Sequence, residues 1–277
     1  MVAGFSLFFY LGKVVWPARL AFDYGWRPPL LLGHSWFYWV WVVPVVVGAV
    51  VWWGGRRRPV LWAAGLVFVV GLAPVLGFNR FLFQKFSTVA DHYLYLAMLG
   101  PAMGAAWAVG RAKRRRVAVG LAGLVIVALG VRAVLQTGVW RDSITLNENS
   151  VAVTPWAFAS WNNLGNAYDD VATGLVKDGR YAEALAAYER TVEMYRAALR
   201  TMPEAPPTSK NLAMALVRVA GLDPNPATKG PRLAEAARHL EMAQGLATGG
   251  AGDPRLVEAA KRVAEARRRL GETPAGR

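Results

Sequence analysis

The 277-residue chain is 55% hydrophobic and has a formal net charge of +14; it contains no cysteine, which excludes disulfide bonds and thiolate metal sites. Residues 1–139 hold 14 of the 32 Lys and Arg residues but only two of the 18 acids, Asp23 and Asp91. Basic residues that lie between apolar runs indicate membrane topology, whereas a nucleic-acid binder would more often show a basic stripe on a polar domain.

Residues 1–35 form the first predicted segment. Its opening run, MVAGFSLFFYLGKVVW, is too short to span a bilayer and is interrupted by Lys13. The run also lacks the basic start and the small-residue cleavage site of a signal peptide. We therefore expect an interfacial or re-entrant helix outside the cytoplasm. The alternative is that this run is the broken end of a longer membrane protein.

Residues 36–136 are predicted to cross the membrane four times. A spanning helix needs about 20 apolar residues. Four stretches meet or approach that length, and their interiors contain no acid; they are residues 36–53, 59–77, 93–110 and 117–135. Four such runs in succession are rare in the cores of soluble proteins, so the stretches predict a polytopic helix bundle.

Two short basic loops give the predicted orientation. The loops GGRRRP, at residues 54–59, and RAKRRR, at residues 111–116, carry eight positive charges and no acid. The positive-inside rule places both loops in the cytoplasm. The loop at residues 78–92 and everything after residue 136 would then lie outside.

After residue 136 the chain becomes polar and alanine-rich, with apolar residues at helical spacing. The run WNNLGNAY places Trp161, Leu164, Gly165 and Tyr168 in the W-x2-L-G-x2-Y pattern of a tetratricopeptide repeat (TPR). Later motif positions are displaced by seven residues in each helix, which is about two turns. We therefore predict one long antiparallel helix pair, near residues 156–178 and 180–202.

A degenerate second repeat is predicted next. SKNLAMAL is interpreted as its first helix and GPRLAEAARHLEMAQGL as its second, separated by the turn-rich loop GLDPNPATKG. A last helix, RLVEAAKRVAEARRRL, follows Pro254. Residues 137–277 are therefore predicted to form a TPR-like helical repeat domain, and the whole chain is predicted to be all-α.

Three stretches in this order resemble a known family. They are YLGKVVWPARLAFDYGW, FSTVADHYLYLAMLGP and WRDSITLNENSVAVTPWAFASWNNLGNAY. Together they resemble the C-terminal half of a bacterial membrane glycosyltransferase-like protein with TPRs. The chain is similar to the transmembrane, TPR-containing O-mannosyltransferases of the GT-C superfamily over residues 5–205.

The resemblance implies a protein of the bacterial inner membrane that takes a sugar from a polyprenyl-phosphate carrier and transfers it to a protein hydroxyl outside the cytoplasm. In such enzymes the catalytic carboxylate lies in the first outer loop, and this sequence has no counterpart of that loop. We therefore expect the C-terminal portion of a transferase and assign no catalytic residue. No cofactor is expected, because the lipid-linked sugar is the substrate. No metal site is expected either, because the adjacent residues Asp91 and His92 would point about 100° apart on a helix and no second pair of ligands lies nearby.

The polar cluster before the third predicted span is the candidate donor site. Arg80 and Lys85 can neutralise the carrier phosphate, and His92 can donate a hydrogen bond to it. Tyr93 and Tyr95 can hydrogen-bond a sugar, or serve only as interface anchors, which is the alternative for the whole cluster. The first segment could line the same cavity, or present a solvated surface, with Lys13, Arg19, Asp23 and Tyr24.

The repeat domain is predicted to bind an acceptor or partner protein. Because Trp161 and Tyr168 are helix-packing positions, a peptide site would instead use the polar residues of the first long helix, which are Asn162, Asn166 and Asp169. The alternative is a packing module that only caps the membrane region.

Two other functions are open. The first is a non-catalytic, membrane-anchored TPR scaffold for protein–protein interaction, which would need only one anchor. The second is a lipid-linked glycan ligase or polymerase. Such a ligase would be expected to show a large outer loop rich in Arg and His, and the loop at residues 78–92 is short.

Overall fold

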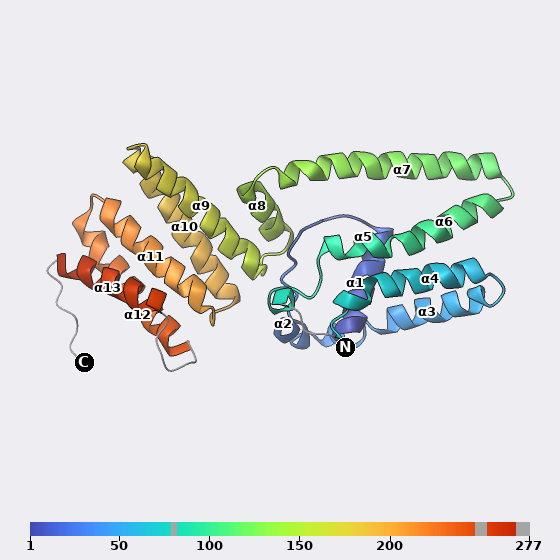
Figure 1. Ribbon diagram of the computed structural model, residues 1–277, viewed down its shortest axis with the longest axis horizontal. Helices are drawn as coiled ribbons and strands as arrows, with labels where there is room; N and C mark the ends of the chain where they lie inside the picture. The colour runs from blue at the N-terminus through green and yellow to red at the C-terminus, as the bar shows by residue number, and fades with distance from the viewer. Residues whose placement is uncertain (79–81, 247–253, 270–277) are drawn as a thin grey trace. The chain divides into compact units, whose positions relative to one another are not determined.

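The computed structural model describes residues 1–78, 82–246 and 254–269, and these residues form helices and no strand (Figure 1). The predicted all-α class is therefore confirmed. The chain divides into two compact units, Met1–Ala157 and Phe158–Arg277. This division lies later than the predicted domain limit after residue 136, because the helix at Ser143–Val153 belongs to the first unit.

The first unit contains eight α-helices among its described residues, with short 3-10 turns between some of them. They are α1 (Val2–Val15), α2 (Pro28–Leu32), α3 (Val42–Gly55), α4 (Pro59–Leu72), α5 (Leu94–Ala97), α6 (Leu99–Arg111), α7 (Arg115–Thr137) and α8 (Ser143–Val153). The 3-10 turns are η1 (Ser35–Tyr38), η2 (Ala73–Val75), η3 (Leu82–Lys85), η4 (Asp91–Tyr93) and η5 (Gly138–Trp140).

Within the described ranges, two helical stretches are long and apolar enough to cross a membrane, Ser35–Gly55 and Arg115–Trp140. A third candidate is the pair Asp91–Ala97 and Leu99–Arg111, which is bent by 49°. The stretch Pro59–Val75 is apolar but shorter, because α4 ends at Leu72 and a 3-10 turn containing Pro74 follows. The structure thus gives two or three candidate spans where the sequence predicts four.

The core of the first unit includes the predicted peripheral segment. Phe5 and Tyr10 of α1 are buried together with Phe37, Leu72 and Val89. Helix α8 joins this unit because the Asn149 side-chain amide donates to the Leu20 carbonyl oxygen at 2.8 Å, and because Val153 packs against the core. Residues 1–35 are therefore an integral part of the bundle.

Helix α4 approaches both α5 and α6 closely at glycine. A Cβ atom on Gly100 would lie 2.3 Å from the Ala64 carbonyl oxygen, and one on Gly71 would lie 2.8 Å from the Ala97 Cα. Small residues at such crossings let helix backbones pack tightly where lipid removes the hydrophobic drive to associate.

The second unit is a row of long helices. They are α9 (Phe158–Lys177), α10 (Tyr181–Thr201), α11 (Pro206–Leu222), α12 (Pro226–Leu246) and α13 (Pro254–Arg269). Helices α9 and α10 have 20 and 21 residues and pack together through a tight turn at Gly179, whose φ is +74°. The predicted long antiparallel pair is confirmed.

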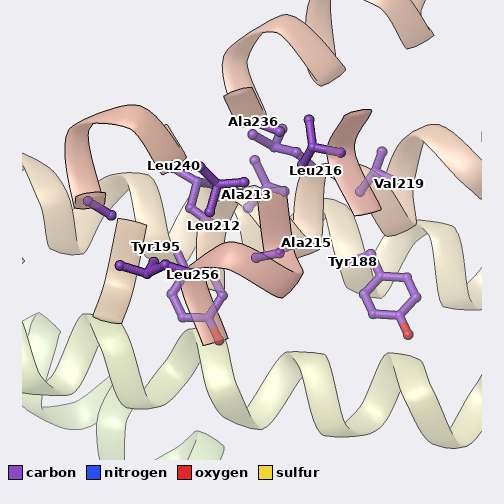
Figure 2. Close-up of a cluster of buried hydrophobic side chains, with 14 of the residues drawn as sticks. Tyr188, Tyr195, Leu212, Ala213, Ala215, Leu216, Val219, Ala236, Leu240 and Leu256 are labelled. Atoms are coloured by element: carbon purple, nitrogen blue, oxygen red, sulfur yellow. The ribbon is translucent and has the colours of Figure 1, made fainter. Parts of the chain in front are cut away.

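The core of this unit lies between α10, α11, α12 and α13 (Figure 2). Gly165 of the W-x2-L-G-x2-Y pattern lets α9 contact α10, because a Cβ there would lie 2.6 Å from the Tyr195 ring. The predicted loop GLDPNPATKG is shorter than expected. Helix α12 begins at Pro226, where the Asn225 side-chain oxygen accepts from the Ala227 backbone N–H at 3.0 Å, and proline suits a first helical turn.

Candidate functional site

The segment at residues 87–90, just before η4, is buried and held by side chains from the start of the chain. The Tyr10 hydroxyl donates to the Ala90 carbonyl oxygen at 3.3 Å and accepts from the Ala90 backbone N–H at 3.2 Å. The Thr88 hydroxyl and backbone N–H both donate to the Trp26 carbonyl oxygen, at 2.7 and 2.8 Å. The approach to the bent helix pair α5–α6 is therefore fixed.

Asp91, the first residue of η4, lies at the centre of a polar network. The Tyr24 hydroxyl is 2.9 Å from both carboxylate oxygens of Asp91 and 3.0 Å from the Arg19 carbonyl oxygen. The Ala21 backbone N–H donates to Asp91 Oδ2 at 2.8 Å. The hydrogen bonds that a carboxylate accepts offset part of the cost of its burial. Asp91 thus ties the loop after α1 to the start of η4.

Lys13 completes this network from the end of α1. Its Nζ atom donates to the carbonyl oxygens of Ala18, at 2.7 Å, and Arg19, at 3.1 Å. It also lies 4.8 Å from the Tyr24 ring centroid, which is a cation–π contact. Arg19 has a φ of 51°, so the loop turns through the left-handed region between Lys13 and Tyr24.

Burial is the main cause of the pKa shifts of Tyr24 and Lys13. It raises the pKa of the Tyr24 hydroxyl, and the nearby negative charge of Asp91 raises it further. Burial also lowers the pKa of Lys13; the charge of Asp91 raises it again in part, and the charges of Arg19 and Arg132 lower it. Tyr24 therefore stays a protonated hydrogen-bond donor. The arrangement can position a helix end and hold charge, and it presents no activated nucleophile.

The predicted donor residues do not all join this network. His92 is exposed, and its ring lies 4.2 Å from the Tyr93 ring. Tyr93 is half-buried and packs against the core of the first unit. Lys85 is exposed, Tyr95 is 75% exposed, and neither takes part in the Asp91 network within the described ranges. Arg80 lies outside the described residues.

Of the residues expected from the first segment, Tyr24 contacts Asp91 directly, whereas Lys13 and Arg19 join the network through the Arg19 carbonyl oxygen, which accepts from both Lys13 Nζ and the Tyr24 hydroxyl. Asp23 has a different local role, because its Oδ1 accepts from the Gly25 backbone N–H at 2.8 Å in a turn where Gly25 has a φ of 63°. No sequence signal indicated the contribution from Tyr10, which looks like one more apolar residue of α1.

An apolar cavity of about 570 Å³ lies between α1, α3, α4 and α6. Its lining includes Leu11 and Val14 of α1, together with Val47, Gly65 and Gly104. Cavities of this size and character accommodate apolar ligands.

The three candidate peptide-binding residues lie on one face of α9, since they are spaced four and three residues apart. The Thr208 hydroxyl donates to Asn162 Oδ1 at 2.8 Å, and the Tyr195 hydroxyl donates to Asn166 Oδ1 at 2.7 Å. Asp169 forms an ion pair with Arg218. These side chains join α9 to α10 and α11, so a bound peptide would have to compete with contacts inside the domain.

Comparison with known protein families, with curated proteins and with solved structures returned no match. The proposed function therefore depends on the residues themselves and on the resemblance of the three sequence stretches.

Proposed function

We propose that this chain is the membrane and helical-repeat portion of a GT-C-type transferase, which moves a sugar from a polyprenyl-phosphate donor to a protein hydroxyl outside the cytoplasm. In this proposal α4 completes a set of four crossings, both basic loops are cytoplasmic, and the second unit is a TPR-like domain outside the inner membrane. Lys85, His92, Tyr93 and Tyr95 form the surface that meets the donor; Arg80, the fifth residue expected there, lies outside the described residues.

The observation that carries the proposal is the Asp91 network. A membrane helix end could be anchored by apolar contacts alone, yet this one is held by Tyr24 and by the backbone of residue 21, with Lys13 beside them. Ionisable residues inside membrane segments are costly, so an acid at the first residue of a candidate span is a candidate functional residue. Asp91 acts here as a positioning residue, because its oxygens are engaged and its neighbour His92 is exposed.

The apolar cavity is evidence in favour of a lipid-linked substrate. Its lining is almost wholly apolar, and Leu11 and Val14 of α1 lie close in sequence to Lys13. A polyprenyl chain could therefore lie against these helices while its phosphate meets cationic side chains at the helix ends.

Binding of polyprenyl phosphate to the whole chain in lipid nanodiscs tests the proposal. The double substitution Arg80→Gln and Lys85→Gln should weaken binding by at least about tenfold, since charge-assisted hydrogen bonds to phosphate are lost. The matched double substitution Lys113→Gln and Arg116→Gln removes the same charge from a basic loop and should leave binding within about twofold. Equal affinity of all three proteins would remove the donor-site proposal.

A membrane-anchored scaffold is the second candidate, and a groove in the second unit favours it. This groove, of about 490 Å³, lies between α11, α12 and α13; its floor includes Met214 and Val217, and its rim includes Lys229 and Arg262. A partner peptide could bind there whether or not the protein takes part in sugar transfer. A protein that binds a partner domain but shows no affinity for polyprenyl phosphate would favour this second function.

A further inference from the structure

The turn between α3 and α4 and the last residue of α6 lie at the same end of the first unit (Figure 1), and an arginine from each lies beside Trp107. The Arg58 guanidinium carbon lies 5.3 Å from the centroid of the Trp107 ring, and the Arg111 guanidinium carbon lies 5.7 Å from it. Arg58 comes from the turn between α3 and α4, and Arg111 is the last residue of α6. Both guanidinium groups therefore lie within cation–π distance of the same indole.

The chain offers these arginines no acid from the elements around them. Residues 24–90 and 92–141 contain no Asp or Glu. Asp91 lies at the opposite end of the α5–α6 pair, and the 13 residues of α6 alone span about 20 Å. Two cations at one indole, without a counter-ion from the surrounding helices, favour an anion from outside the chain.

The surroundings specify what kind of anion fits. Arg58 and Arg111 are exposed, while Trp107 is half-buried on an otherwise apolar helix. An aromatic pair, Trp52 and Trp62, lies near the turn that carries Arg58, with ring centroids 5.6 Å apart. Tryptophan marks the headgroup level of a bilayer, and guanidinium groups bind phosphate oxygens through paired N–H donors.

We propose that Arg58, Trp107 and Arg111 form a binding site for the phosphate of an anionic glycerophospholipid. The lipid would bridge the α3–α4 turn and the end of α6 and so fasten two hairpins of the bundle. This inference rests on the proposed membrane placement of the helices and is independent of the sugar-transfer proposal.

Native mass spectrometry of the whole detergent-solubilised protein, titrated with phosphatidylglycerol or phosphatidylcholine, tests the site. The variant Arg58→Gln/Arg111→Gln is compared with Arg57→Gln/Arg115→Gln, which also removes one arginine from each loop. At moderate salt, the loss of two charges weakens the non-specific attraction of anionic lipid equally in the two variants. The first variant should therefore bind phosphatidylglycerol at least about tenfold more weakly than the second.

Two further variants and three contrary outcomes decide the proposal. Trp107→Leu keeps both charges and should also weaken phosphatidylglycerol binding, because the arginines lose their shared support. If the glutamine variant does not fold, Arg58→Lys/Arg111→Lys should show an intermediate loss, since lysine lacks the paired donors. Equal losses in the two glutamine variants, no preference over phosphatidylcholine, or displacement of the lipid by millimolar inorganic phosphate would each overturn the proposal.

Discussion

Removing the Tyr24 hydroxyl should destabilise the first unit measurably. In Tyr24→Phe the Asp91 carboxylate loses its side-chain donor, which lies 2.9 Å from both carboxylate oxygens, and keeps only the Ala21 N–H of the contacts described. A hydrogen bond to a charged group in a partly buried site contributes about 2 kcal/mol. For a unit of 157 residues this corresponds to a fall in Tm of about 4–8 °C.

The assay is thermal unfolding of the whole chain in detergent, followed by intrinsic tryptophan fluorescence. Tyr38→Phe is the matched control, because the Tyr38 side chain is 47% exposed and its hydroxyl donates to the Leu32 carbonyl oxygen at 3.3 Å. The control should change stability by less than about 0.5 kcal/mol.

A double-mutant cycle makes the test specific to the contact. Asp91→Asn should cost less in the Tyr24→Phe background than in the unmodified protein, because the shared interaction is already gone. Additive effects of the two substitutions, or a Tyr24→Phe protein that unfolds with the Tyr38→Phe control, would refute the assignment of Asp91 as the anchor of η4.

Three further outcomes are expected. Gly100→Ala should destabilise the first unit by about 1–3 kcal/mol, since its Cβ would meet the Ala64 carbonyl oxygen at 2.3 Å, whereas Gly120→Ala, with nothing within 4 Å, should be neutral in the same thermal melt. Leu216→Ala, at a site 1% exposed, should lower the free energy of unfolding of the repeat unit by about 2–5 kcal/mol, measured by circular-dichroism melting. The control Met242→Ala, at a site 48% exposed, should cost little, and equal effects of the two substitutions would contradict the assigned core. Burial lowers the pKa of His239 below its ordinary value of 6.5; the unfolded chain therefore takes up the proton first, and stability should fall as the pH drops from about 6.5 through the folded-state pKa. His239→Gln should flatten that decline, and an unchanged pH profile would exclude this residue as its source.

Local sequence signals predicted much of the helical architecture. The equal displacement of motif positions in both helices predicted the long α9–α10 pair, because a hairpin stays in register only if both arms lengthen together. Gly165 could be recognised from the motif, which requires a residue without a side chain where α9 approaches Tyr195. These features depend on periodicity and on residue size, and both can be read from neighbouring residues.

Features that depend on distant partners could not be predicted in detail. The role of Asp91 could not be predicted from its neighbours, because its hydrogen-bond partner Tyr24 lies 67 residues away in the chain. Helix α8 was assigned to the repeat domain because of its polar composition, and it joins the first unit through a contact between Asn149 and Leu20, 129 residues apart. The length of α4 was overestimated because Pro74 lies in a run whose hydropathy continues past the end of the α-helix.

Photoaffinity labelling tests the central claim of lipid-linked donor binding most directly. A photoreactive polyprenyl phosphate would be added to native membranes that contain the whole protein, and the labelled peptides would be mapped with and without excess unlabelled polyprenyl phosphate. We expect competed labelling of the segment at residues 82–95 and of α1, near Lys13. Labelling that competitor does not reduce, or competed labelling confined to the second unit, would contradict donor binding at this site.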